Sequence, residues 1–206
     1  MLYSTSGNQR QQRNAGSNRT ADPLISPVTP AELANYLGLA YDSSDDSFLE
    51  SFILSACVWY VAYSNNELLE RDYTLKFDRY PQSSEGYSGL GIEPGILQGW
   101  IQIPVNPATD VTEILADGED ITADATIDYD SKPQRIKLPN RFLKAIEISY
   151  TAGYPTSDDI PANILHGIKM LAAYLYEHRG ECDAQNAAQK SGAAGMFSTE
   201  SMILNL

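Results

Sequence analysis

The chain has 206 residues and a formal net charge of −13, which allows one domain with a buried core that needs neither disulfides nor a metal. This acidity argues against a domain that grips DNA through its phosphates, because such domains gather Lys and Arg on one face. Neither a signal peptide nor an apolar run of membrane-spanning length is predicted. The two cysteines, Cys57 and Cys182, fit a reducing compartment better than a disulfide framework.

Residues 1–26 form a predicted N-terminal arm. They are rich in Ser, Asn, Gln, Gly and Arg and contain almost nothing apolar. Such a composition predicts a segment without stable structure of its own. Two interpretations stay open: a flexible extension, or a basic arm that folds onto a partner.

Two helices are predicted next, over residues 30–38 and 45–64. Thr29-Pro30-Ala31-Glu32 has the form of a capping box, and Gly38 ends the first helix. The acidic run at 42–47 lacks the glycine and the final glutamate of a calcium loop, so it is interpreted as a linker. The second helix carries an apolar, aromatic-rich face predicted to be core: Phe48, Leu49, Phe52, Ile53, Ala56, Trp59, Tyr60 and Tyr63.

Between residues 72 and 151 the apolar period changes from that of a helix to that of a strand. Asp117-Gly118 is a favourable hairpin turn, and residues 82–95 form a loop too long for a tight hairpin. The region is predicted to be a small, mainly antiparallel sheet. Its predicted strands are 73–80, 100–103, 111–115, 125–129, 135–138 and 145–148.

The best-bounded element is a helix predicted over 160–179. Asp158 and Asp159 supply an N-cap, Pro161 lies in the first turn and Gly180 follows the end. We expect this helix to pack antiparallel against 45–64 and to contact the strand that precedes it. The fold class is therefore α+β: a small bundle of amphipathic helices with a mainly antiparallel β insertion between the two long helices. The apolar face consists of Ile164, Leu165, Ile168, Leu171, Ala172 and Leu175.

The last segment, 181–206, is of low complexity up to Gly195 and then apolar. Exposed apolar side chains at a chain end predict a docking tail. It docks either on the core of its own chain or on a partner, and both remain open. The tail residues are Met196, Phe197, Met202, Ile203, Leu204 and Leu206.

The order of these elements across 27–180 resembles the phage head–tail connector proteins, the adaptor rings of the virion neck. The resemblance begins at Pro27–Leu33 and continues through Ile101–Val105 and Val111–Ile114. It is most specific from Ile148–Tyr154 through Ile160-Pro161 to the helix ending at Arg179. It does not cover the arm or most of 181–206, and the 82–95 loop departs from it.

The resemblance implies a connector domain over 27–180 and a structural role in the neck of a virion that is assembled in the host cytoplasm. Members form a ring, generally dodecameric, beneath the portal and provide the surface for the next neck or tail protein. DNA passes through the lumen without specific binding, no membrane or cofactor is involved, and the C-terminal segment reaches the portal.

A segregation of charge suggests how copies could meet in such a ring. Residues 110–130 hold acids and no base, among them Asp117, Glu119 and Asp120, whereas 131–144 hold bases and no acid. A head-to-tail interface needs two complementary faces, so the basic edge could meet acid on a neighbour or on the portal. The alternatives are solvated faces or pairing within one sheet. An acidic lumen wall would also keep DNA from sticking. The basic residues are Lys132, Arg135, Lys137, Arg141 and Lys144.

An enzyme is not expected. The two histidines, His166 and His178, lie on one helix, and the chain has no Gly-rich phosphate loop, metal-ligand spacing or nucleophile elbow. The alternative function is a monomeric β-rich ligand-binding or adhesion module of a virion, with Trp100, Tyr80 and Tyr87 as its surface.

Overall fold

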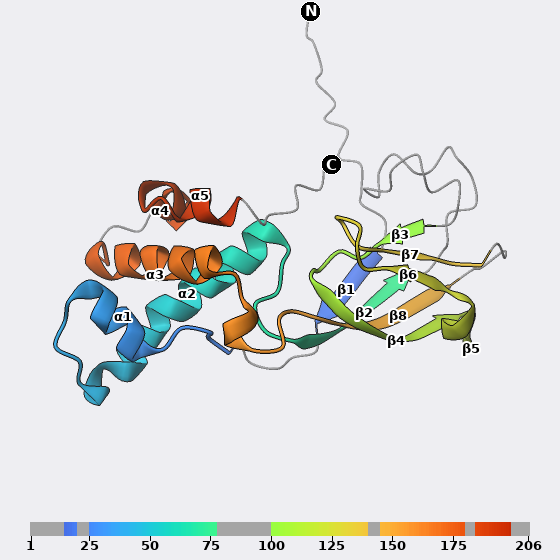
Figure 1. Ribbon diagram of the computed structural model, residues 1–206, viewed down its shortest axis with the longest axis horizontal. Helices are drawn as coiled ribbons and strands as arrows, with labels where there is room; N and C mark the ends of the chain where they lie inside the picture. Colours follow the sequence, from blue (N-terminus) through green and yellow to red (C-terminus); the bar gives the residue numbers. More distant parts are fainter. Residues whose placement is uncertain (1–14, 20–24, 78–99, 140–144, 180–183, 199–206) are drawn as a thin grey trace, which may run out of the picture.

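The computed structural model describes residues 15–19, 25–77, 100–139, 145–179 and 184–198. Figure 1 shows an elongated molecule, with the helices at one end and the β-strands at the other. The α+β class is confirmed. The helices and the strands have separate hydrophobic cores, so we call the two ends the helical half and the β half.

The first helix of the helical half has the predicted capping box. α1 spans Pro30–Leu37 and its N-cap is Thr29, whose Oγ1 accepts a hydrogen bond from the Glu32 N–H at 3.2 Å. The Glu32 carboxylate accepts from the Thr29 N–H at 2.9 Å and also meets Lys169 Nζ at 3.0 Å. Gly38 ends the helix at φ 69°. Glu32 therefore caps α1 and, through its ion pair with Lys169, also links α1 to the long helix at 162–177.

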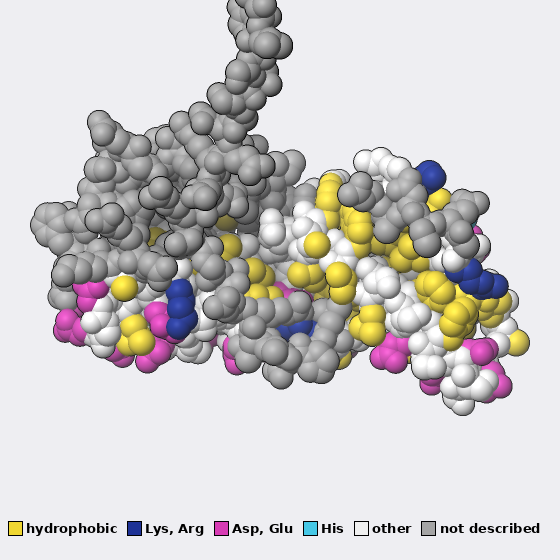
Figure 2. Space-filling model, turned by 180° about the vertical axis from the view of Figure 1, so that it is seen from behind, with side chains coloured by type: hydrophobic (Ala, Val, Ile, Leu, Met, Phe, Trp, Pro, Cys, Tyr) yellow, Lys and Arg dark blue, Asp and Glu magenta, His cyan; other side chains and the backbone are white. Residues whose placement is uncertain are grey.

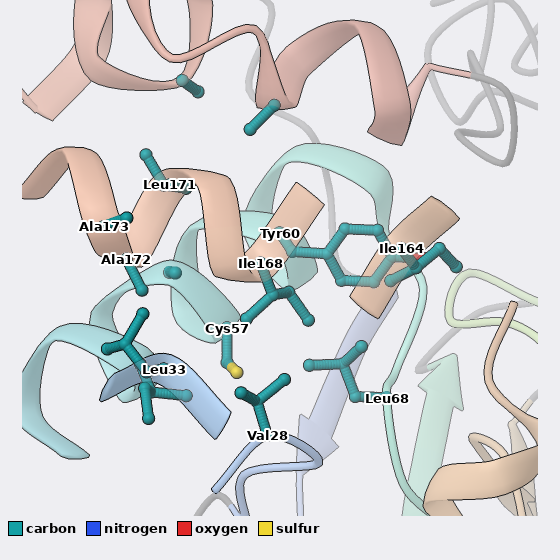
Figure 3. Close-up of a cluster of buried hydrophobic side chains, with 14 of the residues drawn as sticks. Val28, Leu33, Cys57, Tyr60, Leu68, Ile164, Ile168, Leu171, Ala172 and Ala173 are labelled. Atoms are coloured by element: carbon teal, nitrogen blue, oxygen red, sulfur yellow. The ribbon is translucent and has the colours of Figure 1, made fainter. Parts of the chain in front are cut away.

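The two long helices pack together as predicted. After a 3₁₀ turn at Ser43–Asp45, α2 spans Asp46–Ser64, and α3 spans Ala162–Glu177. They lie side by side and run in opposite directions (Figure 1). Figure 3 shows the core between them, where Cys57 and Tyr60 of α2 face Ile164 and Ile168 of α3. The expected aromatic stripe is only partly core, because Phe48 and Tyr63 are 47% and 46% exposed.

α3 begins later than predicted. Asp158 and Asp159 belong to a separate 3₁₀ turn, Ser157–Asp159, and the Asp159 carboxylate bonds to the N–H and hydroxyl of Thr156. Ile160 is extended, at φ −70° and ψ 129°, because a residue before proline avoids the helical region. Pro161 is therefore the N-cap of α3 and not part of its first turn.

α2 also differs from the expectation that no apolar run has membrane-spanning length. The helical stretch Ser43–Ser64 has 22 residues and contains an 18-residue window with a mean hydropathy of 1.2, enough to cross a membrane by length and composition alone. The core helix of a globular domain meets the same criterion, and one face of α2 lines the helical core.

The β half contains two antiparallel sheets rather than the single sheet predicted. Their inward-facing side chains, such as Ile136 from the smaller sheet and Ile148 from the larger, share one core. The Asp117-Gly118 hairpin is confirmed, with both residues at positive φ. The larger sheet has the order β1-β2-β8-β4-β5 and the smaller the order β3-β7-β6. The strands are β1 Ala15–Arg19, β2 Arg71–Phe77, β3 Trp100–Gln102, β4 Ala108–Ala116, β5 Glu119–Asp120, β6 Thr126–Asp128, β7 Arg135–Lys137 and β8 Ile146–Ala152.

Both chain ends contain regular structure where the sequence predicted none. β1, within the expected arm, pairs antiparallel with β2 at the edge of the larger sheet. Main-chain hydrogen bonds are enough to add such a strand to a sheet edge, and they do not depend on side-chain type. The composition of the segment therefore does not predict the strand. Within 181–206, α4 Ala184–Lys190 and α5 Ala193–Phe197 form two short helices beside α3 (Figure 1).

Candidate subunit interface

The basic residues of the smaller sheet surround Trp100. The Arg135 guanidinium lies 4.4 Å from the centre of the Trp100 ring, and Lys137 Nζ lies 5.8 Å from it. β7 is central in the sheet and places Arg135 and Lys137 on one face, opposite the buried Ile136. Side-chain alternation in a strand therefore produced this face as the sequence predicted.

Arg135 also has an acidic partner inside the same sheet. Its Nε lies 2.9 Å from Asp128 Oδ2, and the two residues are opposite each other in the β6–β7 register. The hydrogen bond from Arg135 holds the pKa of Asp128 below its usual value. For Arg135 this is the intrasheet pairing that the sequence left open. Lys132 and Lys137 are exposed, and Arg141 and Lys144 lie outside the described residues.

The predicted acidic residues build the β4–β5 turn. Asp117 Oδ1 accepts a hydrogen bond from the Ala145 N–H at 2.8 Å. Asp120 Oδ1 accepts from the N–H and the hydroxyl of Thr122, at 2.9 and 2.6 Å. The hydrogen bonds from Thr122 lower the pKa of Asp120. Glu119 is exposed. These acids lie on the larger sheet, so the structure does not pair them with Arg135.

Part of the predicted docking tail is already docked on its own chain. Phe197 is completely buried, with its ring 5.0 Å from that of Tyr60 and 5.7 Å from that of Trp59. Met196 is partly buried, and its carbonyl accepts from the Asn163 side chain at 3.3 Å. Of the two interpretations, the structure selects the chain's own core for Phe197. Met202, Ile203, Leu204 and Leu206 lie outside the described residues.

Buried polar groups connect the two halves, and sequence reasoning missed them. Glu67 follows α2 and is completely buried. Its carboxylate accepts a hydrogen bond of 2.5 Å from the Tyr73 hydroxyl, and its N–H donates to Asn106 O at 2.7 Å. Periodicity gives no signal for a buried carboxyl in a linker.

β8, the strand that precedes α3, was expected to pack against that helix. Its buried side chains instead belong to the core of the β half, and not to the core around α3.

Gly153 allows the chain to cross between the halves. It adopts φ +122° and lies directly against the Leu69 backbone, where any Cβ would clash. The Glu70 N–H donates to Tyr154 O at 3.1 Å, and the Tyr154 N–H donates to Leu68 O at 3.2 Å. The close approach of the Leu69 backbone is the physical reason why this position of the chain needs a glycine.

The surface of the helical half has a small pocket where α1 meets α2. It has a volume of about 190 Å³, below the roughly 300–1,000 Å³ of small-molecule sites. Its rim includes Leu39, Tyr41 and Phe48, which are 40%, 48% and 47% exposed.

The two histidines of the sequence lie on α3 and at its C-terminal end. His166 is exposed beside the Tyr36 ring, and His178 is the C-cap of α3 and stacks on Tyr174. Among the described residues, no three His, Cys, Asp or Glu side chains are grouped as a metal site requires. Tyr80 and Tyr87 of the alternative binding surface are not among the described residues.

No protein-family model matches the sequence, and no curated protein matches it closely enough to count as a relative. The fold is similar to chains in solved structures of gene transfer agent (GTA) particles. A chain of the virion of the native particle has a TM-score of 0.65 at 19% identity over 91% of this chain and 95% of its own. A chain of the neck of the empty particle, computed with C6 symmetry, has a TM-score of 0.64 at 16% identity over 85% of this chain and 94% of its own. A chain of the neck of the native particle, computed with C12 symmetry, has a TM-score of 0.61 at 17% identity over 85% of this chain and 94% of its own. At these identities the likeness is one of fold.

Proposed function

We propose that this chain is a structural protein of the neck of a phage-like virion, and more narrowly a head–tail connector. Copies of it form a ring beneath the portal, complete the DNA-filled head and present the attachment surface for the next neck or tail protein. Its role involves no catalysis and no cofactor. DNA passes through the ring without specific contacts.

The observation that carries this proposal is the extent of the fold likeness. It spans both halves of the molecule and nearly the whole length of chains from particle necks. The order of motifs over 27–180 independently resembles the connector family. The six- and twelvefold symmetries stated for those necks fit a chain that repeats around an axis. We propose twelve copies, as the family generally has.

Electron microscopy of the purified chain, alone and mixed with the portal protein of the same particle, tests the proposal. Rings of this chain coaxial with the portal are expected. A chain that stays monomeric and leaves the portal bare would contradict it. A tail tube or a stopper protein incubated with the portal, with and without this chain, then shows whether the ring provides the next attachment surface.

A further inference from the structure

One face of α2 carries exposed, uncharged side chains at a regular spacing along the helix. Phe48, Ser51, Ser55, Val58 and Ala62 follow one another at steps of three, four, three and four, and all five are exposed. We call these residues the α2 seam. Val58 is 57% exposed and Phe48 is 47% exposed. Alternating steps of three and four keep side chains on one line of a helix and are the spacing with which two helices pack against each other.

The polar atoms of the seam are already satisfied. Ser51 Oγ donates to Phe48 O at 2.6 Å, and Ser55 Oγ donates to Ser51 O at 2.7 Å. Serine hydroxyls that bond to their own helix need no external donor or acceptor, so little is lost when water leaves them. Their small size also allows the backbone of a partner helix to approach closely. Covering the seam would therefore leave no buried polar group unpaired.

Charge decides which partner the seam fits. No charged side chain occurs on α2 beyond Glu50, and the next one along the chain is Glu67. Figure 2 shows the helical half, at the right of that view, with yellow, white and some dark-blue surface above the magenta of its lower edge. Two copies of a chain with a net charge of −13 repel each other, so a patch without acid is a favourable place for them to meet. Charged residues are also depleted at the centre of protein interfaces.

A membrane fits this face poorly. Helices that lie on membranes carry Lys and Arg along their polar side and bind anionic lipid. α2 has neither residue between Asp46 and Ser64, and the chain as a whole is acidic.

We propose that the α2 seam packs against a neighbouring copy of this chain. This inference rests on the proposed ring and names its contact. From Phe48 to Ala62 the seam is about 21 Å long at 1.5 Å per residue, on a helix about 10 Å wide. That is on the order of 200 Å², against roughly 800 Å² per partner in a stable interface. The seam is thus the centre of a larger contact, and in a closed ring it meets a different surface of the neighbour.

The chain offers a matched pair of variants to test this. Ala62→Glu places a carboxylate in the seam, and Ala162→Glu places the same side chain at the exposed first residue of α3. Because an unpaired buried charge is costly, Ala62→Glu should weaken the self-association of the full chain at least about tenfold. Ala162→Glu should leave it unchanged within about twofold. Sedimentation over a range of concentrations measures both, and counting rings on the portal by electron microscopy repeats the comparison.

A second variant separates assembly from folding. Val58→Ala removes two methyl groups from an exposed position without adding charge, so the chain should fold normally and still associate several-fold more weakly. Circular dichroism and the urea midpoint establish folding for each variant. Rings that form equally well with Ala62→Glu and Ala162→Glu overturn this inference and leave the neck proposal intact. A wild-type chain that makes no ring even on the portal overturns both. Co-flotation with lipid vesicles that Ala62→Glu abolishes overturns the copy contact in favour of a membrane.

Discussion

The ring of Phe197 occupies the space that a side chain at position 167 would need. A Cβ atom at Gly167 would lie 2.5 Å from Cε1 of Phe197. Gly167 is in the middle of α3, where glycine costs roughly 1 kcal/mol relative to alanine. Here that cost is offset by the docking of α5, which covers the side of α3 facing away from α1 (Figure 1). The C-terminal helices are thus part of the helical core.

Phe197→Ala should destabilise the chain by about 3–5 kcal/mol, the usual range for a buried phenylalanine. The loss arises from the cavity left between Gly167, Trp59 and Tyr60. Urea unfolding followed by circular dichroism measures it. Ser198→Ala is the control, because Ser198 is exposed and its hydroxyl donates to Gly195 O within its own helix end; it should change stability by less than about 0.5 kcal/mol. Equal stability of the two variants would show that α5 does not dock.

Gly153→Ala should destabilise the chain far more than Gly118→Ala. Both glycines have positive φ, but a Cβ at Gly118 meets nothing within 4 Å, whereas one at Gly153 clashes with the Leu69 backbone. Gly118→Ala therefore incurs only backbone strain of about 1–3 kcal/mol. Gly153→Ala must in addition push the two crossing segments apart. Thermal unfolding of the two variants compares them directly, and similar midpoints would be inconsistent with the close approach at Gly153.

Arg135→Gln should raise the pKa of Asp128 towards its ordinary value, because Arg135 supplies the main hydrogen bond that lowers it. A carboxylate with a lowered pKa stabilises the folded state above its unfolded pKa and loses that effect as pH falls through the folded value. The stability difference between wild type and variant should therefore close in acid. NMR titration of the Asp128 carboxyl follows the pKa. Lys137→Gln, which removes a charge but not this bond, should shift it much less.

Cys57 makes the fold sensitive to alkali. Burial raises the pKa of its thiol to about 12. Above the unfolded value of roughly 8.5–9 only the unfolded chain ionises, so stability is complete below that pH and falls as pH rises towards 12. Between pH 8 and pH 10 the wild type should lose about 1.5 kcal/mol more than Cys57→Ala. Urea unfolding at the two pH values tests this, and parallel losses in both proteins would refute it.

Patterns local in sequence predicted much of the helical half. The capping box at Thr29, the left-handed Gly38 and the apolar face of 160–179 all depend on residues three or four positions apart. Such spacings favour a local structure that can be recognised without knowing the tertiary contacts. The Asp117-Gly118 turn belongs to the same group. The charged face of β7 was predicted for the same reason, since alternation alone places Arg135 and Lys137 together.

The sequence alone determined the three helices of 30–179, most of the strands between 72 and 151 and the Asp117-Gly118 turn, but not β1, α4 or α5. Only the tertiary structure decided that the strands form two sheets with a core of their own, that Phe197 fills the gap at Gly167, and that Arg135 meets Asp128. Each of these joins groups brought together by the folded chain, Phe197 and Gly167 being 30 positions apart. Composition and periodicity show that a segment prefers to be buried. Which other segment covers it depends on how closely their side chains pack and on how the whole chain connects the elements.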